Sequence, residues 1–177
     1  MTFAPAGPTG TSSGRRLPKL PPVPAWHQIE SEAPELVARA RRLFDANKHK
    51  TLATLRRDGS PRISGSEIIF ADGQLWFGSM WQAVKALDLR RDPRFALHSA
   101  SDGEDFQGDA KVAGRVEEVD DDDVKRAVVG ADGPSGPMHL FRADITELVV
   151  ISLGGDPPDH MVIDSWHPGR GVTTRRR

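Results

Sequence analysis

Residues 49–100 read HKTLATLRRDGSPRISGSEIIFADGQLWFGSMWQAVKALDLRRDPRFALHSA. Polar and apolar residues alternate through Thr51–Leu55, and Arg62–Phe70 is a second strand-like run. Alternation of this kind is typical of strands that bury one face. The pair Asp72-Gly73 is a strong hairpin signal, and a third apolar run follows it at Leu75–Phe77. This segment therefore predicts an antiparallel meander of strands.

The meander is interrupted by one expected helix. Apolar and charged residues from Val84 to Leu89 have the spacing of a short amphipathic helix. Ser79 is followed three residues later by Gln82, which matches a capping box, so we expect the helix to begin directly after the third strand. Pro93 ends the helix, and the strand pattern resumes at Phe95–His98.

The flanking segments predict further helices and strands. Ser31 is a suitable N-cap for a core-facing helix that ends near Asn47, and we expect the structured chain to begin there. The acidic run Asp120–Asp123 is interpreted as the start of another helix rather than as a metal site, because the helix dipole favours negative charge at this end. Strands are expected at Ala110–Val119, Leu140–Leu153, His160–Trp166 and Gly171–Thr174.

The N-terminal segment differs in composition from the rest. Ala4–Gly14 consists of Ala, Pro, Gly, Thr and Ser, and Leu17–Pro24 is rich in proline. The second of these runs could be a polyproline ligand, but an extended tail is the favoured interpretation, because the segment has too little apolar surface to offset its ordering entropy. We expect Trp26 and Ile29 to attach its end to the domain. The chain is therefore divided into a disordered Pro/Gly-rich tail at residues 1–30 and one domain at residues 31–177.

Composition excludes several classes of protein. The chain has 177 residues, 24 Lys and Arg against 25 Asp and Glu, and no cysteine. Disulfides and thiolate catalysis are thus excluded, and near-neutral charge gives no electrostatic argument for nucleic acid. No apolar run approaches the roughly 20 residues of a membrane span, and the N-terminus lacks the apolar core of a signal peptide. We expect a cytoplasmic protein that binds neither nucleic acid nor membrane.

The junction between the third strand and the helix is a candidate anion site. The first turn of a helix offers N–H groups without intrahelical acceptors, and Lys85 could reach back toward them. Arg62, on an earlier strand, could supply a second cation, and together these groups would hold a phosphate. Spacing alone favours the alternative, in which Ser79 only caps the helix and both cations are solvated surface charges. The six histidines have no metal-ligand spacing, so we expect no metal site.

The combination of these segments resembles a known family. Arg62-Ile63-Ser64, Phe77-Gly78-Ser79, Lys85 with Leu87, and Asp92–Leu97 together are similar to pyridoxamine 5′-phosphate oxidase-like proteins, which are FMN-binding split β-barrels. The similarity extends from about Leu36 to Val119. It implies a mainly β, α+β fold: a six-stranded antiparallel split β-barrel with a few short flanking helices. It also implies a homodimer with FMN in the dimer cleft.

The resemblance assigns cofactor contacts of three kinds. The side chains of Arg62, Lys85 and Ser79 would hold the phosphate. The backbone of Ile63 and Ser64 would line the flavin, and Met80 and Trp81 would lie in the loop that covers the ribityl chain or the ring.

Three functions follow from the resemblance and remain open. The first is an FMN-dependent oxidoreductase that transfers hydride to or from a small organic substrate. It would not be a true pyridoxamine phosphate oxidase, because Glu67 stands where those enzymes place a lysine. The second is an F420-dependent reductase, with Arg170 and Arg175–Arg177 near the long polar tail of that cofactor. The third is a protein that binds flavin or haem without catalysis.

Overall fold

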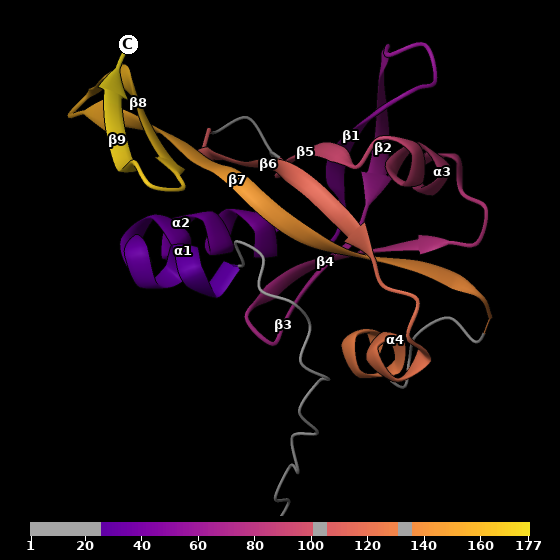
Figure 1. The fold of residues 1–177 in the computed structure, drawn as a ribbon. Helices are drawn as coiled ribbons and strands as arrows, with labels where there is room; N and C mark the ends of the chain where they lie inside the picture. Colours follow the sequence, from indigo (N-terminus) through magenta and orange to yellow (C-terminus); the bar gives the residue numbers. More distant parts are fainter. Residues whose placement is uncertain (1–25, 101–105, 131–135) are drawn as a thin grey trace, which may run out of the picture.

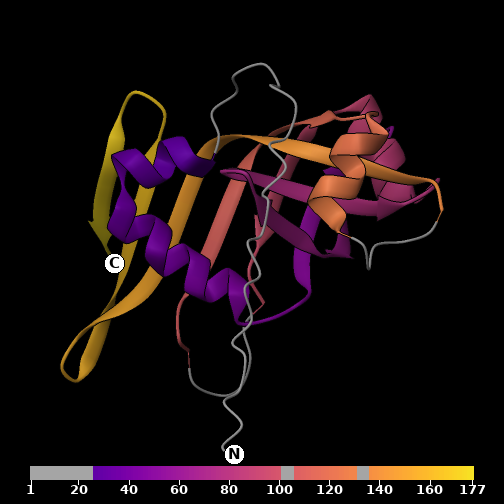
Figure 2. The same ribbon diagram turned by 90° about the horizontal axis from the view of Figure 1, so that it is seen from below.

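The computed structural model describes residues 26–100, 106–130 and 136–177, which form one antiparallel sheet with four helices (Figures 1 and 2). The helices are α1 (Trp26–Glu32), α2 (Pro34–Asp45), α3 (Val84–Arg91) and α4 (Asp122–Val129). The strands are β1 (Lys50–Leu55), β2 (Pro61–Ser66), β3 (Ile68–Ala71), β4 (Gln74–Met80), β5 (Arg94–His98), β6 (Asp109–Glu118), β7 (Met138–Gly155), β8 (Pro158–His167) and β9 (Gly171–Arg176).

The long strand β7 organises the sheet. The strand order is β2-β1-β5-β6-β7-β4-β3, and the hairpin β8–β9 is attached to β7 as well. The first part of β7 pairs with β4, from Met138 to Arg142, whereas its later part pairs with β8, from Leu148 onward. Strand β7 therefore connects the barrel-like part of the sheet to the C-terminal hairpin β8–β9, as Figure 1 shows.

The expected fold class is confirmed: the protein is mainly β, antiparallel and α+β, with short flanking helices. The described residues contain nine strands rather than the six of the expected barrel. The expected strand Arg62–Phe70 is divided at Glu67 into β2 and β3, and the β8–β9 hairpin extends the sheet. The strand order begins at β2 and ends at β3, so the pairings of the described chain leave the sheet open.

Helices α1 and α2 cover one part of the sheet and bury an aromatic cluster. The rings of Trp26 and Phe70 meet edge to face with centroids 4.6 Å apart, and Phe44 lies 6.5 Å from Trp26. The guanidinium of Arg41 lies over the Phe70 ring at 3.9 Å. The expected attachment through Trp26 and Ile29 is confirmed, since both side chains are buried.

The expected N-cap at Ser31 is wrong. The first helix begins at Trp26, and Ser31 lies inside it, with its hydroxyl donating to the carbonyl of Gln28. The helix breaks at Ala33, whose φ is −145°, because the residue before a proline is disfavoured in the α conformation. Helix α2 then begins at Pro34. The predicted tail remains a prediction for residues 1–25, which lie outside the described part of the chain.

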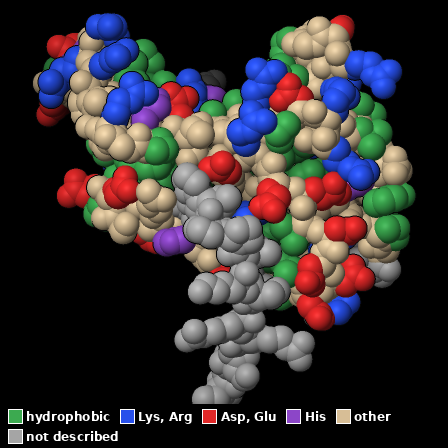
Figure 3. Space-filling view, viewed as in Figure 1, with side chains coloured by type: hydrophobic (Ala, Val, Ile, Leu, Met, Phe, Trp, Pro, Cys, Tyr) green, Lys and Arg blue, Asp and Glu red, His purple; other side chains and the backbone are tan. Residues whose placement is uncertain are grey.

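The acidic run starts a helix, as expected. The Asp121 carboxylate accepts hydrogen bonds from the backbone N–H groups of Asp123 and Val124, and therefore caps α4. Figure 3 shows acidic side chains gathered over α4, while basic side chains gather over the β8–β9 hairpin. Within residues 26–100, 106–130 and 136–177, no group of side chains is arranged to hold a metal ion. No helix of the same residues is long and apolar enough to cross a membrane.

Candidate functional site

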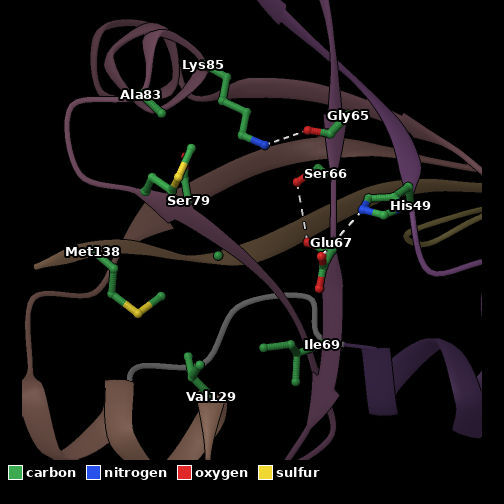
Figure 4. Close-up of a pocket in the computed structure, with 12 residues that line it drawn as sticks. His49, Gly65, Ser66, Glu67, Ile69, Ser79, Ala83, Lys85, Val129 and Met138 are labelled. Carbon is green, nitrogen blue, oxygen red and sulfur yellow. Dashed lines mark hydrogen bonds and ion pairs between the residues drawn. The ribbon is translucent and has the colours of Figure 1, made fainter. Parts of the chain in front are cut away.

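A cavity of about 410 Å³ lies between β2, the end of β4 and the start of α3 (Figure 4). Its wall also includes Met138 at the start of β7 and Val129 at the end of α4. The side chains that bring polar groups to the wall are His49, Ser66, Glu67, Ser79 and Lys85. The cavity therefore lies at the strand-to-helix junction that the sequence indicated.

Ser79 contributes a buried hydroxyl that the protein itself does not use. The residue is only 8% exposed, and its Oγ has no hydrogen-bond partner among the described residues. Leaving such a group unpaired costs about 1–3 kcal/mol, so it is uncommon without a reason. Because the residue lines the cavity, a bound molecule could supply the missing partner.

The expected capping box is wrong, and this explains why the hydroxyl is unused. Ser79 lies in β4, while α3 begins only at Val84 and has no side-chain cap at Ala83. The intervening Gln82 has a φ of +59°, a left-handed conformation that reverses the chain before the helix. The helix therefore starts too late for Ser79 to cap it.

Lys85 supplies a positive charge to the same cavity. It is the second residue of α3, and its Nζ donates to the carbonyl oxygen of Gly65 at 2.6 Å (Figure 4). Burial lowers the pKa of Lys85, and the carboxylate of Glu67 offsets part of that effect. In the first turn of α3 the N–H of Ala86 already donates to the carbonyl oxygen of Ala83 at 2.9 Å, which leaves the N–H groups of Val84 and Lys85 without an intrahelical acceptor. A cation, a hydroxyl residue and the residue that precedes α3 thus line the same cavity, a combination that suits a phosphate.

Arg62 is placed differently from Lys85 and lies outside the cavity wall. Its Nε donates to Oδ2 of Asp88 at 2.6 Å, and the hydroxyl of Thr54 donates to the same oxygen at 3.0 Å. Arg91 donates to the other oxygen at 2.9 Å. Burial raises the pKa of Asp88, but the hydrogen bonds from Arg91, Arg62 and Thr54 outweigh it, so the net shift is downward.

The sequence did not indicate Asp88 as the partner of Arg62. Asp88 is next to Leu89 on the buried side of α3, and a carboxylate at such a position needs a partner of opposite charge. Asp88 lies three residues after Lys85, roughly one helical turn, which is a rise of about 4.5 Å. Arg62 is therefore held by a residue about one helical turn beyond Lys85, without contributing to the wall itself.

The remaining expected site residues lie around the cavity. Met80 lines it, whereas Ile63 and Ser64 of β2 precede the lining residue Gly65. Trp81 lies outside the wall, and its ring stacks on His139 with centroids 4.8 Å apart and an interplanar angle of 10°. The structure thus brings Ser79, Met80 and Lys85 together in the wall and leaves Arg62, Ile63, Ser64 and Trp81 beside it.

His49 and Glu67 are wall residues that the sequence did not indicate as a pair. The imidazole Nε2 of His49 is 3.6 Å from Oε1 of Glu67, and Lys48 is 3.3 Å from the same oxygen. Both His49 and Glu67 are exposed at the rim. Their common feature in the sequence is only that each flanks a strand, which is too general a signal to reveal the contact.

The open antiparallel sheet with short flanking helices is consistent with the split β-barrel class of folds. Residues 36–150 match the model of the pyridoxamine 5′-phosphate oxidase family, which is more than half of the chain. The protein belongs to this family, as the sequence resemblance implied.

Solved structures with the same fold include proteins of several kinds. PhzG from Burkholderia lata, in complex with tetrahydrophenazine-1-carboxylic acid, is 14% identical with a TM-score of 0.60, over 83% of this chain and 92% of that one. A pyridoxamine 5′-phosphate oxidase-related, FMN-binding protein from Nostoc punctiforme is 16% identical with a TM-score of 0.55, over 81% and 93%. A heme-binding protein from Mycobacterium smegmatis is 14% identical with a TM-score of 0.55, over 81% and 88%. These likenesses show the fold alone. No curated protein matches the chain.

Proposed function

We propose that the protein binds FMN in this cavity and acts as a flavin-dependent oxidoreductase on a small organic substrate. The observation that carries the proposal is the buried, unpaired hydroxyl of Ser79 in the wall of the cavity that Lys85 also lines. A phosphate oxygen would accept from both groups and relieve the cost of the unpaired hydroxyl. The family and the FMN-binding neighbour support the choice of cofactor.

Each residue has a defined task in this proposal. Lys85 exchanges the Gly65 carbonyl for the phosphate, and the N–H groups of Val84 and Lys85 at the start of α3 donate to it. Arg62, oriented by Asp88, supplies a second positive charge in this proposal. The backbone of Ile63 and Ser64 lies beside the ring system. When bound, the isoalloxazine supplies the hydride chemistry.

Apolar side chains beside the cavity would exclude water from the reacting ring. Exposed apolar residues are present on β2, at the end of β4, in the loop after β4 and on α3: Ile63, Met80, Trp81, Val84 and Leu87. Contiguous exposure of this kind is typical of an interaction surface. We propose that a second copy of the chain covers them, so that the cofactor lies in the cleft of a homodimer. Sedimentation at micromolar concentration is expected to give a dimer, and a monomer alone would contradict the covered cleft.

Haem is the second candidate cofactor. It is favoured by the heme-binding neighbour and by His49, which brings an imidazole to the cavity rim. The absorption spectrum of purified protein separates the candidates, because flavin, deazaflavin and haem have different bands. Flavin bands are expected. A Soret band would favour haem, and a deazaflavin spectrum would favour F420.

FMN titration tests the phosphate site directly. Lys85→Ala is expected to weaken FMN binding about tenfold or more, because it removes a charge-assisted contact. The double variant Arg62→Ala with Lys85→Ala is expected to remain folded and to be colourless. Arg57→Ala is the control, since Arg57 is exposed in the β1–β2 turn, away from the cavity. Wild-type affinity in the double variant would place the phosphate elsewhere.

A further inference from the structure

The short loop between β4 and α3 is attached to a buried histidine on β7. The side chain of His139 has no exposed surface, and its Nε2 is 3.2 Å from the backbone nitrogen of Gln82 in the loop. On the other side of the ring, Nδ1 is 2.6 Å from Oε1 of Glu118 on β6. The imidazole therefore connects the loop to a strand far away in the sequence.

The two contacts together define one form of the ring. A backbone N–H is always a donor, so Nε2 must carry a lone pair in order to accept from Gln82. The carboxylate of Glu118 is an acceptor, so Nδ1 must carry the hydrogen. Both contacts are satisfied only by the neutral tautomer with hydrogen on Nδ1. Glu118 is itself fixed by Arg90 on α3, whose Nε is 3.0 Å from Oε2.

The loop needs such an attachment because its conformation is strained. The left-handed φ of Gln82, +59°, is unfavourable for a residue other than glycine, because it brings Cβ too close to the following carbonyl oxygen. Trp81 adds a second contact by stacking on the His139 ring. The loop also carries Ala83, which precedes α3 and lines the cavity together with Met80. The position of the loop therefore sets where the first turn of α3 meets the cavity.

We propose that His139 is a positioning residue, which holds this loop in place by accepting the Gln82 N–H and so fixes the phosphate-binding end of the cavity. Glu118 selects the tautomer that can accept this hydrogen bond. The effect on cofactor affinity rests on the proposed FMN site, whereas the attachment of the loop does not.

Two substitutions separate the two contacts of the ring. His139→Gln places its amide near the position of Nε2 and can still accept from Gln82. His139→Asn places its amide near Nδ1, so it can donate to Glu118 but leaves the Gln82 N–H unpaired. Both variants lose the aromatic stacking on Trp81, so each is the matched control for the other.

Acrylamide quenching of tryptophan fluorescence measures the exposure of Trp81, and therefore the position of the loop, in protein without cofactor. Trp81 is 52% exposed, whereas Trp26, Trp76 and Trp166 are buried, so added quencher acts mainly on Trp81. We expect stronger quenching in His139→Asn than in His139→Gln. FMN titration is expected to show about tenfold weaker binding for Asn and less than about threefold for Gln, because one buried hydrogen bond separates them. Equal quenching in the two variants would overturn the proposal.

A measurement on the wild-type protein does not depend on the variants folding. Nitrogen-15 NMR of the imidazole at neutral pH is expected to show Nδ1 protonated and Nε2 unprotonated. A hydrogen on Nε2 would overturn the proposal, since that nitrogen could not accept from Gln82. Failure of the wild-type protein to bind FMN would refute the proposed function instead, while quenching and NMR would still decide the role of His139.

Discussion

Two regions of the barrel-like sheet differ in how completely their side chains are packed and hydrogen-bonded. Where α1 and α2 cover the sheet, Trp26, Phe44 and Phe70 pack ring against ring. The indole N–H of Trp166, buried nearby, donates to the carboxylate of Glu32 at 2.9 Å. At the junction of β4 and α3, a buried hydroxyl has no partner among the described residues and a tryptophan is half exposed.

This difference separates stability from binding. The covered side gains from burying apolar area and pairing its polar groups, which is what lowers the free energy of a folded chain. On the proposed function, the cavity side gives up some of that gain in order to keep groups available for the cofactor. Substitutions on the covered side should therefore change stability, and those at the cavity should change affinity.

The largest expected effect is on the covered side. Phe44→Ala should lower the free energy of unfolding by about 3–5 kcal/mol, because Phe44 is fully buried and its removal leaves a void. Urea denaturation measures this, and the affinity of the folded fraction for FMN should stay unchanged. Leu153→Ala is the control: Leu153 is half exposed, and its loss should cost about 1 kcal/mol or less. A comparable loss for both variants would remove the contrast between the two sides.

Asp88 is buried and also holds Arg62, so changing it should affect both stability and affinity. Asp88→Ala leaves Arg62 and Arg91 without their shared carboxylate. We expect the free energy of unfolding to fall by about 2–3 kcal/mol, which is less than for a fully buried ion pair because Arg62 is partly exposed. FMN affinity should fall as well, since Arg62 loses its orientation. A loss of stability with unchanged affinity would show that Arg62 has no role in binding.

The pH dependence of stability gives a second test of Asp88. Its pKa in the folded protein is lowered, so its contribution to stability is fully present above the unfolded value, about 4, and is lost as the pH falls through the folded value. Asp88→Asn should therefore weaken the dependence of the free energy of unfolding on pH below about 4. Denaturation of both proteins across this range measures the difference. An identical acid profile would contradict the assigned interaction.

Local patterns in the sequence were sufficient for much of the fold. Alternating residues predicted β1, an Asp-Gly pair predicted the β3–β4 turn, and Asp121 caps α4 as the acidic run indicated. These features depend on neighbours in the chain and on one buried face, so a single sequence contains their causes. The start of α1 was missed because Ser31 has the local character of an N-cap, whereas the helical conformation of Trp26–Glu32 is stabilised by burial of Trp26 and Ile29 against distant residues.

The candidate site was only partly predictable for the same reason. Lys85 could be found because the helix and its first turn have local signals. The capping box failed because the conformation of Gln82 is stabilised by His139, a residue 57 positions away in the chain. The partner of Arg62 was missed because it lies 26 positions away, on α3. Contacts between side chains on distant elements do not follow from the spacing of neighbouring residues, so a sequence pattern does not reveal them.

The smallest expected effect concerns the charge on Lys85, and it belongs to the cavity side alone. Burial lowers the pKa of Lys85 from its usual value of 10.5. Only the ammonium form makes a charge-assisted contact to phosphate, so FMN affinity should fall as the pH rises through this lowered pKa. The total decrease should be about tenfold, equivalent to one such contact. Lys85→Arg should lack the decrease, because a guanidinium stays protonated throughout. Isothermal titration of FMN at increasing pH, with urea denaturation at each pH to confirm folding, measures both proteins. Equal decreases in wild type and Lys85→Arg would show that another group titrates, and would place the phosphate away from Lys85.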